Sequence, residues 1–374
     1  MARPASDRGG SRPASTGAAA EGPLPFHIVT GFLGAGKTTL INRLLRAPDL
    51  ADALIIVNEW GEIGLDHLLY ERLAGDAILV SGGCVCCALR GDLVDALADV
   101  LTRRDAGALP PFRRIVLETT GLAEPAPIVH ALFAHPDLAA RLALTGVTTV
   151  VDAVNGAATA ARAESARQIA FADRLVMSKT DLVPAAERAA RLADLIAELR
   201  RLNPVAPILD GAAGEFAPAD FVAASAAPPP ATPATVAAPS SSGRAPGPAH
   251  GVRSFVFRAE APIDPGAFAT FLSALGRLLG PRLLRFKGLF ALADRPETPI
   301  LVDGVQHAFH APRTLERWPD ADRSTRAVLI VEGVSAREAE DLWAALARVP
   351  RIDAPDLAAL ADNPLTIRTG GLLG

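Results

Sequence analysis

The chain has 374 residues, 50% of them apolar and 21% charged, and its formal net charge is −4 at pH 7. This composition suffices for two modest domains and excludes a wholly disordered chain. The slightly acidic balance argues against a nucleic-acid partner, because such affinity depends on clustered positive charge. No stretch approaches the roughly 18 consecutive apolar residues that cross a bilayer, and no apolar segment of a secretion signal precedes Phe26. We therefore expect a cytoplasmic protein that binds neither nucleic acid nor membrane.

The first part of the chain predicts a disordered arm and then an α/β domain. Residues 1–23 are rich in Ser, Ala, Gly, Pro and Arg, which favours disorder. Over residues 24–211, short apolar runs alternate with Ala/Leu-rich amphipathic stretches. The expected strands are 26–30, 53–57, 77–81, 114–118, 146–151 and 173–177, and the expected helices are 37–46, 88–104, 126–143 and 185–201. This alternation predicts an α/β domain whose mostly parallel sheet has helices on both faces and binds ligands beyond the carboxyl ends of its strands. The glycine-rich sequence GFLGAGKT at residues 31–38 makes the expected fold that of a P-loop NTPase.

The remainder predicts a linker, a second domain and a tail. Residues 212–250 are dominated by Ala, Pro, Ser and Gly and cannot bury enough apolar surface to offset the entropy of ordering them. Residues 251–350 are expected to form a small α+β domain, and residues 351–374 a C-terminal tail. Within that domain the expected strands are 254–258, 283–293, 299–302 and 326–332, and the expected helices are 264–279 and 335–348.

A phosphate-binding loop follows the first expected strand. Residues 31–38 read GFLGAGKT, which matches the pattern GxxxxGK[ST] between a strand and a helix. Loop glycines let backbone N–H groups approach phosphate oxygens, Lys37 would neutralise the β and γ phosphates, and Thr38 would ligate Mg²⁺. The alternative, an accidental glycine turn, is disfavoured by this context. The expected nucleotide contacts are Gly31, Gly34, Ala35, Gly36, Lys37, Thr38 and Thr39.

A base-reading motif ends the strand expected near residue 177. Residues 178–181 read SKTD, which resembles the N-K-x-D guanine motif of GTPases with Ser178 in place of Asn. The carboxylate of Asp181 can accept hydrogen bonds from both N1 and N2 of guanine, a pair that adenine does not offer. We therefore expect GTP rather than ATP, with the Lys179 stem along the base. The alternative is a solvated turn before a helix.

Lysine is rare in this chain. It occurs only at Lys37, Lys179 and Lys287, and every other basic residue apart from histidine is arginine. A lysine at a given position is therefore expected to meet a specific demand for a compact ammonium group. Two of the three lie in the nucleotide motifs.

Two further segments carry acidic groups near the expected nucleotide. Residues 118–121 read ETTG at the tip of a strand, where Glu118 can hold Mg²⁺ and the amide of Gly121 can bond the γ phosphate. Glu118 could instead cap the following helix. Residues 57–66, with Glu62 among three carboxylates, form either a switch loop or an ordinary polar loop.

All three cysteines of the chain, Cys84, Cys86 and Cys87, follow one expected strand. Thiolates at a helix start have a lowered pKa and bind soft or borderline cations such as Zn²⁺ or Co²⁺. Three of them leave a tetrahedral ion one ligand short, so Glu62, His67 or a partner's group would complete the set. The alternatives are buried small side chains or a redox pair. His307 and His310, three residues apart, would bind metal only if helical, and are more simply surface or core residues.

The segments GFLGAGKTT, GEIGLD, GGCVCC, ETTG and SKTD, in this order, resemble the CobW family of P-loop GTPases, which supply metal ions to target proteins. Residues 285–288 (RFKG) and 306–310 (QHAFH) look like the C-terminal domain of that family. The resemblance implies a metal motif at the three cysteines and a nucleotide loop from Gly31 to Thr39. It also implies a γ-phosphate sensor at residues 118–121 and a base reader at residues 178–181.

The function implied is that of a GTP-hydrolysing metallochaperone. With GTP and Mg²⁺ it would bind Zn²⁺ or Co²⁺ and deliver the ion to a client metalloprotein or metal-insertion complex, in cobalamin synthesis or zinc homeostasis. Lys37, Thr38, Glu118 and Gly121 would serve hydrolysis. Assembly as a homodimer stays open. Two other classes compete: a nucleotide-gated metal sensor and an ATP-dependent small-molecule kinase.

Overall fold

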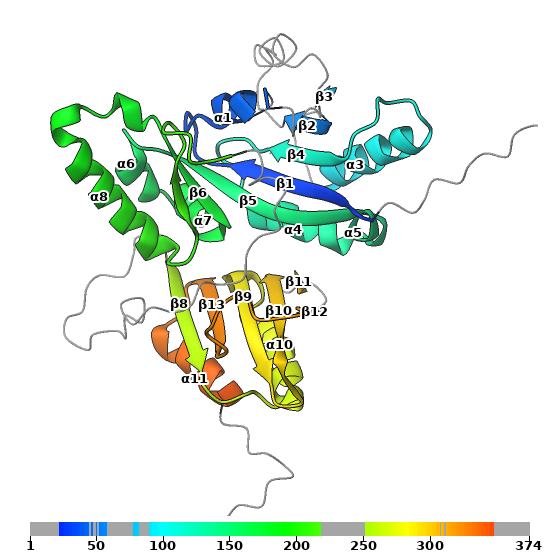
Figure 1. Ribbon diagram of the computed structural model, residues 1–374, viewed down its shortest axis with the longest axis vertical. Coiled ribbons are helices and arrows are strands. Elements are labelled where there is room, and N and C mark those ends of the chain that lie inside the picture. The colour runs from blue at the N-terminus through cyan, green and yellow to red at the C-terminus, as the bar shows by residue number, and fades with distance from the viewer. Residues whose placement is uncertain are drawn as a thin grey trace, which may run out of the picture.

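The computed structural model describes residues 22–44, 46–47, 50, 52–57, 78–81, 90–217, 251–306, 308–309 and 312–347, and for residues 78–81, 90–92, 308 and 347 the backbone only. These residues form two sheets in two domains (Figure 1). In the first domain, seven described strands pair in parallel in the order β3-β2-β4-β1-β5-β6-β7. They are β1 (Leu24–Thr30), β2 (Ala53–Val57), β3 (Ile78–Ser81), β4 (Arg114–Glu118), β5 (Leu142–Asp152), β6 (Arg174–Ser178) and β7 (Ile208–Asp210). The predicted parallel sheet is confirmed.

Helices cover both faces of this sheet, as the sequence predicts. They are α1 (Lys37–Leu44), α3 (Arg90–Asp105), α4 (Pro125–Ala134), α5 (Pro136–Arg141), α6 (Gly156–Ala160), α7 (Ala163–Phe171) and α8 (Ala185–Leu202). Successive strand residues face opposite sides, so Ile28 packs toward α3, α4 and α5 whereas Val29 packs toward α1. Each such fully buried side chain stabilises the fold by about 1.5–3 kcal/mol. Apolar runs without alternation, like residues 53–57, are what a doubly covered parallel sheet requires.

The helix expected over residues 126–143 is wrong in its extent. Helix α4 ends at Ala134, His135 is extended with φ −96° and ψ 110°, α5 then begins at Pro136, and β5 begins at Leu142. The proline ring disfavours helical backbone at the residue before it, which breaks the helix at this point. Helices α6 and α7 were not expected at all.

The second domain holds an antiparallel sheet covered on one face by two helices, which confirms the expected α+β unit. Its strands are β8 (Val252–Ala259), β9 (Leu283–Leu292), β10 (Arg295–Val305), β11 (Ala308–Phe309), β12 (Arg313–Thr314) and β13 (Thr325–Glu332), and its helices are α10 (Pro265–Leu279) and α11 (Ala336–Ala347). Helix α10 starts where the Asp264 side chain accepts a hydrogen bond from Ala267 N. Phe271 and Phe286 meet edge to face between α10 and the sheet, with ring centroids 6.0 Å apart.

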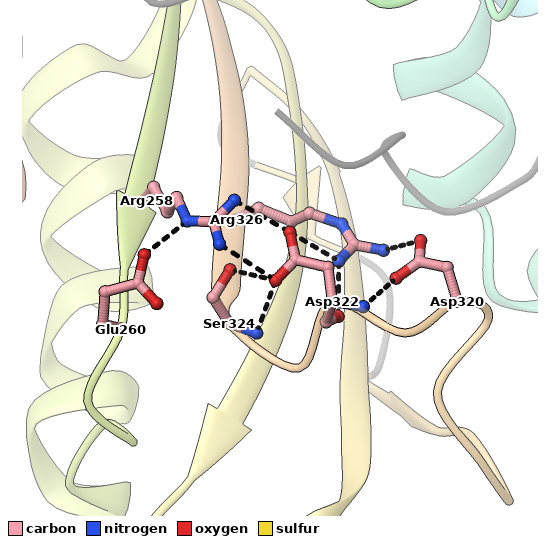
Figure 2. Close-up of polar contacts among 6 residues, drawn as sticks. All are labelled: Arg258, Glu260, Asp320, Asp322, Ser324 and Arg326. Carbon is pink, nitrogen blue, oxygen red and sulfur yellow. Dashed lines mark hydrogen bonds and ion pairs between the residues drawn. The ribbon is translucent and has the colours of Figure 1, made fainter. Parts of the chain in front are cut away.

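A buried ion network fixes the turn before β13 at the end of this domain (Figure 2). The side chain of Arg326 is 1% exposed and contacts Asp320 at 2.5 Å, while its other terminal nitrogen donates to the backbone oxygen of Asp322 at 2.8 Å. Arg258 on β8 pairs with Asp322 through two nitrogens and with the exposed Glu260. The paired partners keep the buried guanidinium from carrying an uncompensated charge.

The other face of the second sheet packs against the first domain. Leu284, Val328 and Ile330 form one apolar cluster with Ala170 of α7. The hydroxyl of Ser254 donates to the carbonyl of Leu202 at 2.6 Å across the same boundary. Helix α7 therefore lies on the side of the first sheet that faces the second domain (Figure 1).

The packed core of the first domain reaches Phe216, which lies in the range expected as linker and packs with Val176. Two 3₁₀ turns, Thr180–Leu182 and Gly280–Arg282, complete the described elements. None of the described helices is both long enough and apolar enough to cross a membrane.

Candidate nucleotide site

The phosphate loop joins β1 to α1 at the carboxyl end of the sheet. Gly31 has φ +144°, and a Cβ there would lie 2.3 Å from the carbonyl oxygen of Val150, so only glycine fits. The Lys37 ammonium donates to the carbonyl of Gly31 at 3.0 Å and to that of Phe32 at 3.4 Å. The lysine at the start of α1 is therefore held over the loop, at the end of the helix where backbone N–H groups are unpaired and attract anions.

Two oxygen atoms that can ligate a metal ion lie next to each other beside this loop. The Thr38 hydroxyl donates to Oε1 of Glu118 at 2.8 Å, and Glu118 is 1% exposed at the end of β4. Hydroxyl and carboxylate oxygens suit Mg²⁺, a hard cation that usually takes one or two protein ligands and the oxygens of a bound phosphate. Glu118 does not cap a helix, because α4 starts at Pro125 with Glu124 as its N-cap residue.

The loop that follows Glu118 packs directly on the phosphate loop. Thr119 continues the sheet, since its amide donates to Val29 O at 3.0 Å and its hydroxyl to the Thr30 hydroxyl at 2.8 Å. A Cβ at Gly121 would lie 2.6 Å from the Cα of Leu33. The absence of a side chain at Gly121 thus lets its backbone approach the phosphate loop, where an amide can reach a bound phosphate.

The residues expected to read the base are tied to the same loop. The Ser178 hydroxyl donates to Ala35 O at 2.6 Å, and the Lys179 ammonium donates to Gly34 O at 2.7 Å. Lys179 has a left-handed backbone with φ +57°, a strained conformation for a residue with a side chain and one that concentrates at functional sites. Serine thus uses its hydroxyl to hold the phosphate loop.

Asp181 lines a cavity of about 430 Å³ beside the phosphate loop. The other lining residues are Gly36, Thr39, Leu40, Arg43, Val150, Val176, Ser178, Lys179, Leu182, Gly211 and Ala212. The Asp181 side chain is exposed, and its carboxylate makes no hydrogen bond to any described residue. Arg43, also in the lining, donates to the carbonyl of Gly211. The cavity therefore combines apolar walls with one free carboxylate, the combination that a guanine base requires.

Sequence reasoning missed Asp152, which takes part in this site. Its carboxylate accepts from Lys179 Nζ at 2.8 Å and from Val154 N at 2.8 Å. Burial would raise the pKa of Asp152, but the hydrogen bonds from Lys179, Val154 and Asn155 hold that pKa below its usual value. The signal was available, because Asp152 directly follows the predicted strand 146–151, at the ligand-binding edge of a parallel sheet.

The metal motif lies outside the described residues, as do the two side chains expected to complete it; these are Cys84, Cys86, Cys87, Glu62 and His67. The separate pair His307 and His310 also lies outside the described residues. The strand that leads to the cysteines is described: in the parallel pairing, Val57 of β2 is the partner both of Ser81 at the end of β3 and of Glu118 at the end of β4.

The phosphate loop lies between a strand and a helix, Thr38 donates to Glu118 beside it, and Ser178 at the end of β6 donates to it. These features define a P-loop nucleotide-binding protein. The model of the CobW/HypB/UreG nucleotide-binding domain matches residues 25–209, and the model of the cobalamin synthesis protein CobW C-terminal domain matches residues 252–347. The chain belongs to the CobW family.

Curated relatives match about half of the chain. The zinc chaperone YjiA of Escherichia coli (strain K12) is 37% identical over 187 residues, which cover 50% of this chain and 57% of the relative. The zinc-regulated GTPase metalloprotein activator 1 of Schizosaccharomyces pombe is 34% identical over 170 residues, which cover 43% of this chain and 40% of the relative. The aligned regions thus span about half the length of these relatives.

A solved structure matches both domains. The crystal structure of Zn(II)-bound YjiA GTPase from E. coli has a TM-score of 0.61 and 27% sequence identity, and the match covers 87% of this chain and 99% of that one.

Proposed function

We propose that this protein is a GTP-hydrolysing metallochaperone that binds Zn²⁺ at Cys84, Cys86 and Cys87 and releases it to a client metalloprotein in the cytoplasm. The strand order supports this most directly. Ser81, three residues before the first cysteine, and Glu118, beside the phosphate loop, flank the same residue of β2. Two strand spacings separate these backbones by about 10 Å. A metal site after β3 would therefore begin close to the nucleotide.

The chain's own residues account for the nucleotide chemistry. Asp181 accepts the N1 and N2 hydrogens of guanine, and the Lys37 ammonium neutralises charge on the β and γ phosphates. Thr38 and Glu118 would hold Mg²⁺, which when bound screens the charge that develops on the phosphates. The Gly121 amide donates to the γ phosphate, so loss of that phosphate releases the loop from residue 118 to residue 121.

The cargo follows from the thiolate set and from the relatives. Thiolates are ligands for Zn²⁺ and for Co²⁺, and an incomplete set of three favours an ion that is handed on. YjiA and the fission-yeast activator are named for zinc, which favours zinc over cobalt for this chain. We propose that GTP tightens metal binding and that hydrolysis loosens it, and by linkage the metal tightens GTP by the same factor.

Zinc titrations of the full chain test this proposal. With a non-hydrolysable GTP analogue and Mg²⁺, the affinity for Zn²⁺ should exceed that with GDP by at least about fivefold. Lys37→Ala should remove this nucleotide dependence and leave zinc binding, whereas the pair Cys86→Ser and Cys87→Ser should remove zinc binding and leave GTP turnover. Equal zinc affinity with analogue, with GDP and without nucleotide would refute nucleotide-controlled delivery.

A further inference from the structure

Helix α7 contacts the γ-phosphate loop and the second domain through adjacent residues. Gln168 is fully buried, and its Nε2 donates to Gly121 O at 3.2 Å and to Ala123 O at 2.9 Å. Its Oε1 is buried with no hydrogen-bond partner in the described part of the chain. A buried amide that loses its hydrogen-bond partners cannot replace them with water, and this loss costs about 1–3 kcal/mol. Gln168 must therefore follow the backbone of the Gly121 loop when that loop moves.

The residue before it spans the domain boundary. Arg167 contacts Glu124, the N-cap residue of α4, through one terminal nitrogen at 2.5 Å. Its Nε and other terminal nitrogen donate to the two carboxylate oxygens of Glu332 at 3.3 and 2.7 Å. Glu332 ends β13 and is the register partner of Val252 on β8. One guanidinium therefore joins the segment after Gly121 to the second sheet with a paired, directional contact, which lysine could not reproduce.

We infer that Arg167 and Gln168, together with Glu124 and Glu332, form an α7 bridge through which the state of the Gly121 loop sets how tightly the second domain docks. The four residues are positioning residues, because none touches the nucleotide. When the Gly121 amide is drawn to a γ phosphate, its carbonyl carries Gln168 along, and Glu124, three residues after Gly121, shifts with respect to Arg167. The bridge to Glu332 then weakens, and the docking of the second domain loosens.

Other contacts of this boundary are apolar or lie away from the loop. Ala170 packs on Leu284 and Val328, Asp173 pairs with Arg285 and Lys287, and Val305 of β10 packs in the apolar cluster that holds α4. Among the described residues, the bridge adds to these a directional, charged contact between the segment after Gly121 and the second sheet. Looser docking of the second domain would expose a surface of its sheet to a client only in the GTP state. This inference extends the proposed function and rests on its nucleotide cycle.

Hydrogen exchange of the full chain tests the bridge. Peptides of β8 and β13 next to Glu332 should exchange at least about fivefold faster with GTP analogue and Mg²⁺ than with GDP. Glu332→Gln should reduce this difference below twofold and leave basal GTP turnover unchanged. Gln168→Met removes the hydrogen bonds to Gly121 and Ala123 at the other end of the bridge. It should also reduce the difference below twofold and leave basal GTP turnover unchanged. Glu260→Gln is the matched control, since it removes an ion pair with Arg258 far from the boundary and should keep the full difference (Figure 2).

Two results would overturn the bridge: equal exchange of these peptides in the two nucleotide states of the wild-type chain, or an undiminished difference in Glu332→Gln. The hydrogen-exchange measurement does not depend on zinc binding. A chain that shows the bridge-dependent difference but binds no Zn²⁺ therefore supports the bridge while refuting metal delivery.

Discussion

Replacing Asp173 by Asn should destabilise the protein strongly, because this carboxylate neutralises two cations at the domain boundary. Its side chain is 3% exposed and lies between α7 and β6. It accepts from Arg285 Nη2 at 2.9 Å, from Lys287 Nζ at 3.1 Å and from Val147 N at 2.9 Å. Asparagine keeps the shape but removes the charge. Arg285 and Lys287, which come from the second domain, are then left buried with less compensation.

The contacts set the expected magnitude. Asp303, at 3.1 Å from Arg285, is the other carboxylate paired with that guanidinium. Oδ1 of Asp303 and Nη1 of Arg285 are buried without hydrogen-bond partners among the described residues, so Arg285 is already short of one hydrogen bond before Asp173 is removed. Breaking a buried ion pair by removing one partner costs about 3–5 kcal/mol. Burial would lower the pKa of Arg285, but Asp173 and Asp303 raise it, so Arg285 stays protonated and keeps its positive charge.

Urea unfolding followed by circular dichroism measures the effect. Glu297→Gln is the matched control, because its partner Arg323 is 63% exposed and Glu297 is 75% exposed, so its loss should change the free energy of unfolding by less than about 1 kcal/mol. Adding Lys287→Met to Asp173→Asn should recover part of the loss, since one unpaired charge is removed. A loss for Asp173→Asn no larger than that of the control would refute the reasoning.

Two further predictions concern stability at low pH and base selection. Burial, together with the charge of Arg174, lowers the pKa of His27 from 6.5 to about 3. Between these values the unfolded chain binds a proton that the folded chain does not, so stability falls as the pH falls, by about 1.4 kcal/mol per unit. His27→Gln should lack this contribution in urea unfolding at pH 7, 6 and 5, and an unchanged pH slope would contradict it. Asp181→Asn should weaken GTP binding at least about tenfold and favour xanthosine triphosphate, whose O2 can accept from the new amide, as measured by competition; retained GTP preference would place the base elsewhere.

The strands and the phosphate loop could be predicted because their determinants are local. The run 53–57 is apolar throughout, and the structure has β2 with the same bounds. The glycine pattern of residues 31–38 needs only its flanking strand and helix to be meaningful. Where the prediction failed, the rule for proline was available: Pro136 lies inside the expected helix 126–143, and the chain leaves the helical conformation at His135.

The polar contacts of α7 could not be predicted in the same way. The helix has only nine residues, from Ala163 to Phe171, and a helix of that length is marginal in isolation, so its existence depends on packing between two domains. Gln168 contacts Gly121 across 47 positions of the chain, and Arg167 contacts Glu332 across 165. No local pattern specifies a partner at such separations, because the pairing exists only after the sheet has placed α7 beside the second domain.

The three lysines show where composition can still indicate such long-range contacts. Lys37 and Lys179 both lie in nucleotide motifs, and both donate to carbonyls of the phosphate loop. Lys287 belongs to no nucleotide motif, yet it is buried and donates to Asp173 beside Arg285. A compact ammonium fits where a second guanidinium would crowd the first, which gives this lysine a physical reason in an arginine-rich chain. The rarity of the residue therefore identified three packed polar sites, and the third, at the domain boundary, is adjacent to the helix that we propose carries the nucleotide state to the second domain.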